Sequence, residues 1–172
     1  PRPHFTSVEC RRRRLAALVP GKGLVRPRRI RIDRLAVKWL VDANVISEPT
    51  RPDPDPRVVR WLRDHEPELA VDPIIVGEVR FGILLLPRGR KRKRLEQWFD
   101  EGVGRLVCLP FDANTSRIWA EILARLRSRG RAMPIKDSLI AATALVHDLT
   151  VVTRNRRDFE DSGVKIFDPF RE

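Results

Sequence analysis

The sequence predicts an α/β fold in which helices cover both faces of a central parallel sheet. Short apolar runs alternate along the chain with longer segments of helical periodicity, and this alternation is typical of βαβ units. The runs expected to form strands are largely apolar, as strands buried on both faces of a sheet are. They read WLV, LAV, RLVCLP, TVVT and VKIF and begin at residues 39, 69, 105, 150 and 164.

Five segments between these runs are expected to form helices, at residues 57–65, 74–86, 90–102, 114–128 and 136–148. In the first segment, Val58, Val59 and Leu62 share one helical face. The second segment is apolar on nearly every side, which predicts a helix buried in the core. The fourth is followed by Gly130, a residue type that favours the left-handed backbone at the end of a helix. The Pro-rich stretch PTRPDPDP predicts a loop before the first helix.

Composition excludes several classes of protein. The chain has 172 residues and is 42% hydrophobic, which is ordinary for a globular domain. No apolar run approaches the roughly 18 to 20 residues that span a bilayer, and the apolar run after RRRR is too short for a signal peptide. Two cysteines and three scattered histidines give neither a disulfide framework nor the spacing of a zinc site. We therefore expect a cytoplasmic protein without membrane association.

The net charge of +12 is concentrated near the N-terminus. Residues 1–36 contain 11 Lys and Arg against 2 Asp and Glu, which leaves 24 basic and 21 acidic residues for the rest of the chain. We expect residues 1–37 to form a basic, disordered extension and residues 38–172 to form the folded domain. The extension is either a solvated tail or an arm that contacts nucleic-acid phosphates. A further alternative is that Val37 marks the natural start, which N-terminal sequencing of the native protein would test.

Four carboxylates are expected to meet at the carboxyl ends of the strands, where open α/β sheets bind ligands. Asp42 follows the first strand, and Asp158 follows the strand TVVT. Asp137 opens the Ala-rich helix, and Glu78 stands among the apolar positions of the helix predicted at 74–86. Such a cluster is a candidate metal site.

Each of these carboxylates also has a purely structural explanation. Asp42 and Asp137 are suited to helix N-caps, although neither is followed three residues later by Glu or Gln. Glu78 would pair with Arg80 or another Arg, and Asp158 would form a surface ion pair. As a group, however, carboxylates ~4 Å apart repel one another by about 4 kcal/mol per pair at an effective dielectric constant of about 20. A hard divalent cation, Mg²⁺ or Mn²⁺, prefers oxygen ligands and removes that repulsion.

The rest of the sequence contains no competing catalytic motif. There is no Gly-rich phosphate loop, and no His is spaced to activate Ser47 or Ser138. Acidic clusters that hold Mg²⁺ are suited to phosphodiester hydrolysis, because the metal activates water and neutralises charge on the leaving oxygen. The sequence therefore predicts a metal-dependent nuclease.

Four stretches of the chain resemble the VapC-type toxins of the PIN-domain ribonuclease family. They read LVDANVISE, GEVRFGI, PIKDSLIAATALVHDLTVVTRNRRDF and GVKIFDP, and together they span about residues 38–170. The third is the most specific, because an acidic helix start, a small-residue helix, a strand and the TRN…DF pattern follow in a fixed order. The resemblance implies a PIN fold and a Mg²⁺- or Mn²⁺-dependent endoribonuclease. It also implies homodimerisation and inhibition by a cognate VapB-type antitoxin.

The resemblance also implies roles for residues at matching positions. Asp42 and Asp137 would bind the metal directly. Glu78 would act through water or as a base, and Asp158 would hold a second metal or its waters. Polar residues that would orient the carboxylates or the substrate are Asn44, Thr153 and Asn155. The stretch before Glu78 departs from the family pattern, because it reads VDPIIVGE where these proteins often have Ser or Thr.

Basic residues would supply contacts beyond the carboxylates. Arg154, Arg156 and Arg157 flank Asp158, and they either hold RNA phosphates or form a solvated loop. The run RGRKRKR at residues 88–94 is either a solvated face or a contact for RNA or an acidic antitoxin.

Two other functions stay open from the sequence. A catalytically silent nucleic-acid-binding module would bind nucleic acid through the basic extension without cleaving it. A DNA-directed nuclease of the same fold would cleave DNA in preference to RNA. Metal-dependent cleavage separates the first alternative from a ribonuclease, and a side-by-side assay on RNA and DNA separates the second.

Overall fold

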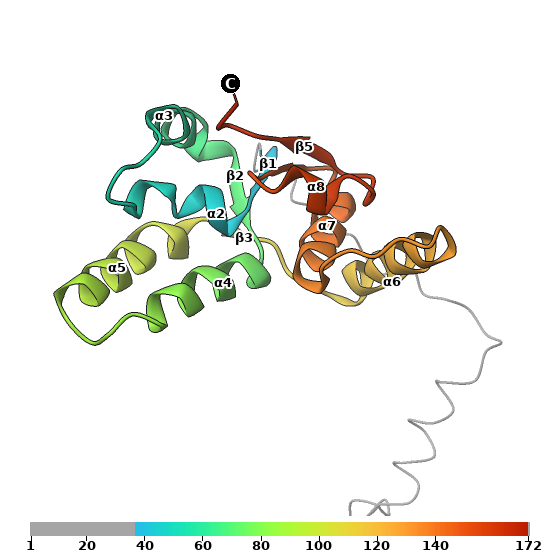
Figure 1. Ribbon diagram of the computed structural model, residues 1–172, viewed down its shortest axis with the longest axis horizontal. Coiled ribbons are helices and arrows are strands. Elements are labelled where there is room, and N and C mark those ends of the chain that lie inside the picture. The colour runs from blue at the N-terminus through green and yellow to red at the C-terminus, as the bar shows by residue number, and fades with distance from the viewer. Residues whose placement is uncertain (1–36, 172) are drawn as a thin grey trace, which may run out of the picture. The chain divides into compact units, whose positions relative to one another are not determined.

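The computed structural model describes residues 37–171, which fold around a five-stranded parallel sheet (Figure 1). The strand order is β3-β2-β1-β4-β5. The strands are β1 Trp39–Val41, β2 Leu69–Val71, β3 Val107–Cys108, β4 Thr150–Val152 and β5 Lys165–Phe167. The five predicted strands are therefore confirmed, although β3 contains only two residues. The expectations about the basic extension concern residues that lie outside the described part of the chain.

Seven α-helices and three short 3₁₀ helices connect the strands between residues 37 and 171. The α-helices are α2 Ala43–Ile46, α3 Pro56–His65, α4 Pro73–Leu84, α5 Arg90–Glu101, α6 Ala113–Ser128, α7 Ile135–His147 and α8 Arg156–Phe159. The 3₁₀ helices are η1 Glu48–Thr50, η2 Glu66–Glu68 and η3 Val103–Arg105. The five predicted helices are confirmed, and α6 ends just before Gly130, whose φ is +66°. None of the helices in this part of the chain is long and apolar enough to cross a membrane.

Helices cover both faces of the sheet, so the predicted fold class is confirmed (Figure 1). Leu40 and Val41 are consecutive in β1 and point to opposite faces, as the twofold period of a strand requires. Helices α6 and α7 pack on the face of Leu40, with a core that includes Val151, Ile122 and Ile140. Helices α2, α3 and α5 pack on the face of Val41, with a core that includes Val152, Val45 and Val58.

The strand order creates a crevice at the carboxyl ends of β1 and β4. The chain moves outward from β1 to β2 and β3, and then returns to the other side of β1 to form β4 and β5. Val41 in β1 lies beside Val152 in β4, so Asp42 and Thr153, which follow them, are neighbours. Open α/β sheets bind ligands at this kind of reversal, because the connections leave the two strands in opposite directions.

One expectation about burial is wrong. The helix predicted to be buried on nearly every side is α4, and it buries Ile75, Val79 and Ile83. Phe81, however, is 58% exposed, and Leu85 just beyond the helix is 68% exposed. The helix packs against α2, α5 and α7, so the apolar residues on its remaining side face outward.

Candidate metal centre

Asp42 lies at the end of β1, in the crevice beside β4, and is only 5% exposed. Its Oδ1 accepts a hydrogen bond of 2.6 Å from the Ala43 N–H, so Asp42 does occupy the N-cap position of α2. Its Oδ2 accepts hydrogen bonds from Asn44 Nδ2 and Thr153 Oγ1, both at 2.6 Å. These bonds fix the orientation of the carboxylate at the point where the strand order reverses.

Asn44 and Thr153 connect Asp42 to the turn that follows β4. Asn44 Nδ2 also donates to Thr153 Oγ1 at 3.1 Å, and Asn44 Oδ1 accepts from the Arg154 N–H at 3.2 Å. The Asn155 N–H donates to Thr153 Oγ1 at 3.0 Å. Asn155 therefore joins this network through its backbone, while its exposed side chain makes no cap hydrogen bond to α8.

Glu78 projects from α4 and is paired with a lysine. Lys136 Nζ lies 2.8 Å from Glu78 Oε1, and the Glu78 side chain is 25% exposed. The expected alternative pairing with Arg80 is wrong, because Arg80 Nη2 lies 3.7 Å from Glu96 Oε1 instead. Lys136 directly precedes Asp137 in α7, so the Glu78–Lys136 ion pair joins the two helices that carry these carboxylates.

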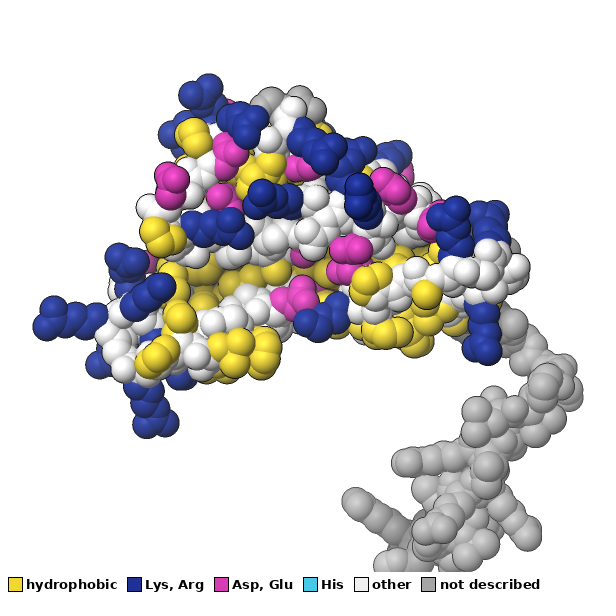
Figure 2. Space-filling view, viewed as in Figure 1, with side chains coloured by type: hydrophobic (Ala, Val, Ile, Leu, Met, Phe, Trp, Pro, Cys, Tyr) yellow, Lys and Arg dark blue, Asp and Glu magenta, His cyan; other side chains and the backbone are white. Residues whose placement is uncertain are grey.

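Asp137 lies in the first turn of α7, while Pro134 occupies the N-cap position. The N-cap explanation for Asp137 is therefore wrong. The pKa of Asp137 is raised to about 6, first by burial and then by the negative charges of Asp42, Asp158 and Glu78. The charges of the other three predicted carboxylates thus all raise the pKa of Asp137. Figure 2 shows acidic side chains gathered near the middle of one face of the molecule, where α4 approaches α7.

Asp42 has a raised pKa for similar reasons. Burial is the largest cause, and the charge of Glu78 adds to it. Hydrogen bonds from Thr153, Ala43 and Asn44 work in the opposite direction, because they stabilise the ionised carboxylate. The carboxyl groups of Asp42 and Asp137 therefore both resist ionisation when no cation balances their charge.

Asp158 lies in α8 and is half-buried. Within residues 37–171 its carboxylate forms no ion pair, so the structure does not support the surface ion-pair explanation. The neighbouring Arg154, Arg156 and Arg157 are exposed, and the Arg154 guanidinium lies 4.8 Å from the centre of the Phe170 ring. The structure therefore brings Asp158 toward the other carboxylates and leaves the three arginines at the surface beside it.

Two charged residues near the centre, Lys136 and Asp72, were not predicted to belong to it. Lys136 was not expected to pair with Glu78, from which it is 58 residues distant in sequence. Asp72 follows β2 and caps α4, with its Oδ1 accepting from the Ile74 and Ile75 N–H groups at 3.0 and 2.9 Å. Burial raises the pKa of Asp72, and the charge of Glu78 adds to the shift. Its position directly after a strand is the same signal that identified Asp42.

The grouped side chains fit a divalent cation by donor type and by charge. They offer carboxylate, amide and hydroxyl oxygens, which Mg²⁺ and Mn²⁺ prefer. Within the described chain, no three His, Cys, Asp or Glu side chains are already positioned as a complete set of ligands. A cation among these carboxylates would nevertheless favour their ionised forms and offset the repulsion that raises the pKa of Asp137.

Residues 39–164 match the family model described as the PIN domain. Over 139 residues the chain is 38% identical to Toxin FitB of Neisseria gonorrhoeae. The aligned region covers 77% of this chain and 99% of FitB. The chain is 35% identical over 137 residues to VapC ribonuclease Y4jK of Sinorhizobium fredii, covering 76% of this chain and 96% of that protein. The crystal structure of FitAcB from N. gonorrhoeae matches with a TM-score of 0.70 and 37% identity, over 78% of this chain and 99% of that one. The chain belongs to the PIN-domain family, in the group that includes FitB and the VapC ribonucleases.

Proposed function

We propose that this protein is a divalent-metal-dependent endoribonuclease and the toxin of a type II toxin–antitoxin system. It hydrolyses RNA phosphodiester bonds and is neutralised by a VapB-type antitoxin. The observation that carries the proposal is the grouping of Asp42, Glu78 and Asp158 near Asp137, whose pKa their charges raise. The similarity to proteins named Toxin FitB and VapC ribonuclease Y4jK supports it.

The proposed cofactor is Mg²⁺ or Mn²⁺. Asp42 and Asp137 are its proposed direct ligands. Glu78 acts through water or as a base, and Asp158 holds a second metal or its waters. When bound, the metal activates water and neutralises charge on the leaving oxygen of the RNA.

The chain's own residues prepare the site for this chemistry. Asn44 and Thr153 orient the Asp42 carboxylate, so that it does not have to reorganise when substrate binds. Lys136 holds Glu78 in place and adds a positive charge beside the expected position of the RNA phosphate. Further positive charge for RNA phosphates comes from three exposed arginines after β4: Arg154, Arg156 and Arg157.

Cleavage of RNA and DNA by the full-length protein tests this proposal. With Mg²⁺ or Mn²⁺ we expect RNA to be cut, and EDTA should abolish the activity. Asp42→Asn and Asp137→Asn should each lower the rate at least about 100-fold, since a missing metal ligand costs at least as much as a missing partner of a ligand. Asp64→Asn, which changes an exposed carboxylate on α3, is the matched control.

Three outcomes of this assay would contradict the proposal. Undiminished cleavage by either site variant would remove the proposed site. Binding of nucleic acid without cleavage would favour a catalytically silent binding module. Preferential cleavage of DNA would favour a DNA-directed nuclease of the same fold.

We also propose that the protein is a homodimer and acts in the cytoplasm. The support for a dimer is the exposed apolar surface at the end of α4, formed by Phe81, Leu84 and Leu85. Figure 2 shows exposed hydrophobic side chains over α4, with Lys and Arg side chains around the nearby end of α5. Contiguous apolar surface of this kind marks protein–protein contact sites in soluble proteins.

A further inference from the structure

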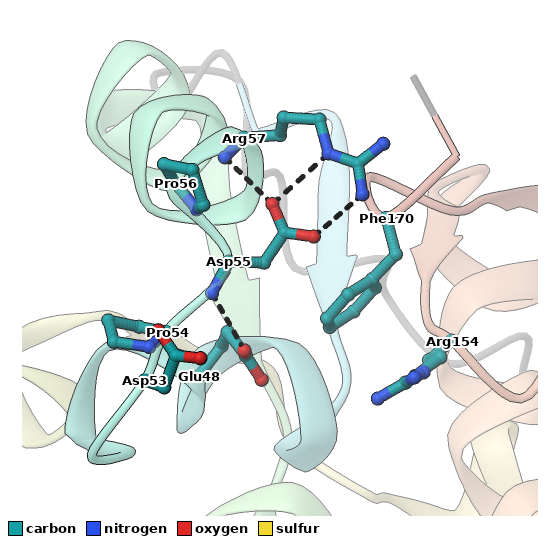
Figure 3. A pocket seen from close by; sticks show the side chains of 8 residues that line it. All are labelled: Glu48, Asp53, Pro54, Asp55, Pro56, Arg57, Arg154 and Phe170. Carbon is teal, nitrogen blue, oxygen red and sulfur yellow. Dashed lines mark hydrogen bonds and ion pairs between the residues drawn. The ribbon is translucent and has the colours of Figure 1, made fainter.

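We propose that a pocket beside the carboxylates binds a guanine base of the RNA substrate. The pocket has a volume of about 440 Å³, within the range of small-molecule sites. Its main lining residues are Glu48, Asp53, Asp55, Arg57, Arg154 and Phe170 (Figure 3). This inference rests on the proposed ribonuclease function and adds to it a site that selects the base next to the cut.

Arg154 connects this pocket to the proposed metal centre. Its N–H donates to Asn44 Oδ1 at 3.2 Å, and Asn44 Nδ2 donates to Asp42 Oδ2 at 2.6 Å. The Arg154 side chain lines the pocket (Figure 3). An RNA strand bound at Asp42 can therefore place a neighbouring nucleotide in the pocket.

Phe170 gives the pocket a fixed aromatic surface. The Phe170 N–H donates to Asp168 Oδ1 at 3.1 Å. Asp168 is only 4% exposed, and its Oδ2 lies 3.3 Å from Arg171 Nε. The Arg154 guanidinium lies over the Phe170 ring, 4.8 Å from its centre. Unpaired RNA bases stack on guanidinium planes as well as on aromatic rings. A base in the pocket can therefore stack on the outer face of the Arg154 guanidinium, which the Phe170 ring supports from its other face.

Two carboxylates that line the pocket are already paired. Glu48 is buried, accepts a hydrogen bond from the Asp55 N–H at 3.0 Å, and lies 3.1 Å from Arg51 Nε. Asp55 accepts two side-chain hydrogen bonds from Arg57, at 3.1 and 2.7 Å. These bonds lower the pKa of Asp55 to about 2, so Asp55 stays ionised and bound to Arg57. Glu48 and Asp55 therefore already have partners and are not the acceptors that the pocket offers to a ligand.

Asp53 is the acceptor that the pocket can offer to a ligand. Its carboxylate is exposed and has no hydrogen-bond or ion-pair partner between residues 37 and 171. In Figure 3, Asp53 and Arg154 come from opposite sides of the pocket. A carboxylate has two acceptor oxygens, and guanine offers two adjacent donors, N1–H and N2–H₂, on its Watson–Crick edge. Adenine, cytosine and uracil each offer a single donor group there, so the pocket matches guanine best.

Binding of single nucleotides to the full-length protein tests the pocket without requiring cleavage. We expect GMP to bind at least about fivefold more tightly than AMP, CMP or UMP, as measured by calorimetry or NMR. Asp53→Asn should abolish that preference. Phe170→Ala should weaken GMP binding about fivefold or more, whereas Phe170→Trp should retain it. Asp64→Asn, outside the pocket, should bind GMP as the unmodified protein does.

The ends of cleaved RNA provide a second readout. The unmodified protein should cut mainly beside guanine, and Asp53→Asn should redistribute its cuts among the four bases. Equal binding of the four monophosphates, or the same cut sites in both proteins, overturns the guanine pocket and leaves the ribonuclease proposal intact. GMP binding that requires Asp53, found without any RNA cleavage, supports the pocket and overturns the ribonuclease. Weaker antitoxin binding by Asp53→Asn, with GMP binding unchanged, overturns the pocket as a nucleotide site.

Discussion

Thr153 joins three parts of the proposed metal centre through one hydroxyl group. Its Oγ1 donates to Asp42 Oδ2 and accepts from Asn44 Nδ2 and the Asn155 N–H. The residue is fully buried, so water cannot replace these bonds. Because a donor to a carboxylate favours its ionised form, Thr153 keeps Asp42 able to bind a cation in spite of its burial.

Thr153→Val should therefore weaken metal binding. The substitution keeps the shape of the side chain and removes the donor to Asp42, so the pKa of Asp42 should rise further and protons should compete with the metal. We expect Mn²⁺ affinity, measured by calorimetry at pH 7, to fall about 10- to 100-fold. Thr153→Ser keeps the hydroxyl group and is the matched control. Equal affinities for Thr153→Val and Thr153→Ser would show that the hydrogen bond does not support the metal.

The stability of the metal-free protein should fall as pH rises toward 6. The pKa of Asp137 is about 6 in the folded protein and close to 3.8 in an unfolded chain. Between pH 3.8 and about pH 6, Asp137 therefore holds a proton in the folded state that it has lost in the unfolded state. The protonated group contributes its full stability below about pH 4, and this contribution is lost as pH rises through the folded-state pKa. Because Asp137 is partly solvated, we expect a loss of only about 1 kcal/mol.

Thermal unfolding in EDTA measures this effect. The Tm of the unmodified protein should fall by about 3 °C between pH 4 and pH 7, relative to Asp137→Asn, which cannot ionise at this position. Saturating Mg²⁺ should remove the difference, because a bound cation favours the ionised carboxylate. Identical pH dependence in the two proteins would mean that the other carboxylates do not act on Asp137.

The helix α4 shows what a local sequence pattern predicts and what it does not. The apolar periodicity of neighbouring residues predicts the helix itself, and its residues Ile75, Val79 and Ile83 are buried. The pattern does not say what covers each side, because that depends on distant segments or on other molecules. Phe81 is consequently exposed in the single chain although it is as apolar as the residues that the helix buries.

Asp72 fixes the N-terminus of α4 and should affect stability through the cap rather than through its charge. Asp72→Ala removes the acceptor for the Ile74 and Ile75 N–H groups and should lower the free energy of unfolding by about 1 to 2 kcal/mol. Asp72→Ser keeps a cap oxygen without a buried charge, so it should be at least as stable as the unmodified protein. Urea unfolding measures both variants at pH 7. Equal loss of stability in the two variants would contradict the capping role.

The topology of the whole molecule explains why only part of the candidate site could be predicted from sequence. The carboxylates come from four separate segments, and they meet because β4 returns to lie beside β1. Asp42 and Asp158 could be placed near the site because each follows a predicted strand. Glu78 was expected there because it stands among apolar residues, and Asp137 because it opens a helix, while the roles of all four carboxylates depended on the family resemblance. The Glu78–Lys136 pair and the pocket at Phe170 depend on folded geometry, so no sequence pattern pointed to them.

The apolar surface of α4 should form a contact between two copies of the whole protein. Phe81 and Leu85 are 58% and 68% exposed, and moving such side chains out of water provides the main favourable term in most protein association. We expect the full-length protein to sediment as a dimer at micromolar concentration. Phe81→Glu or Leu85→Glu should shift it to a monomer with an unchanged circular dichroism spectrum, because each places a charge in the contact. Gln97→Glu, which adds the same charge on an exposed position of α5, should leave the dimer intact. If both α4 variants stay dimeric, the dimer uses another surface, and the exposed side of α4 is then available to the antitoxin instead.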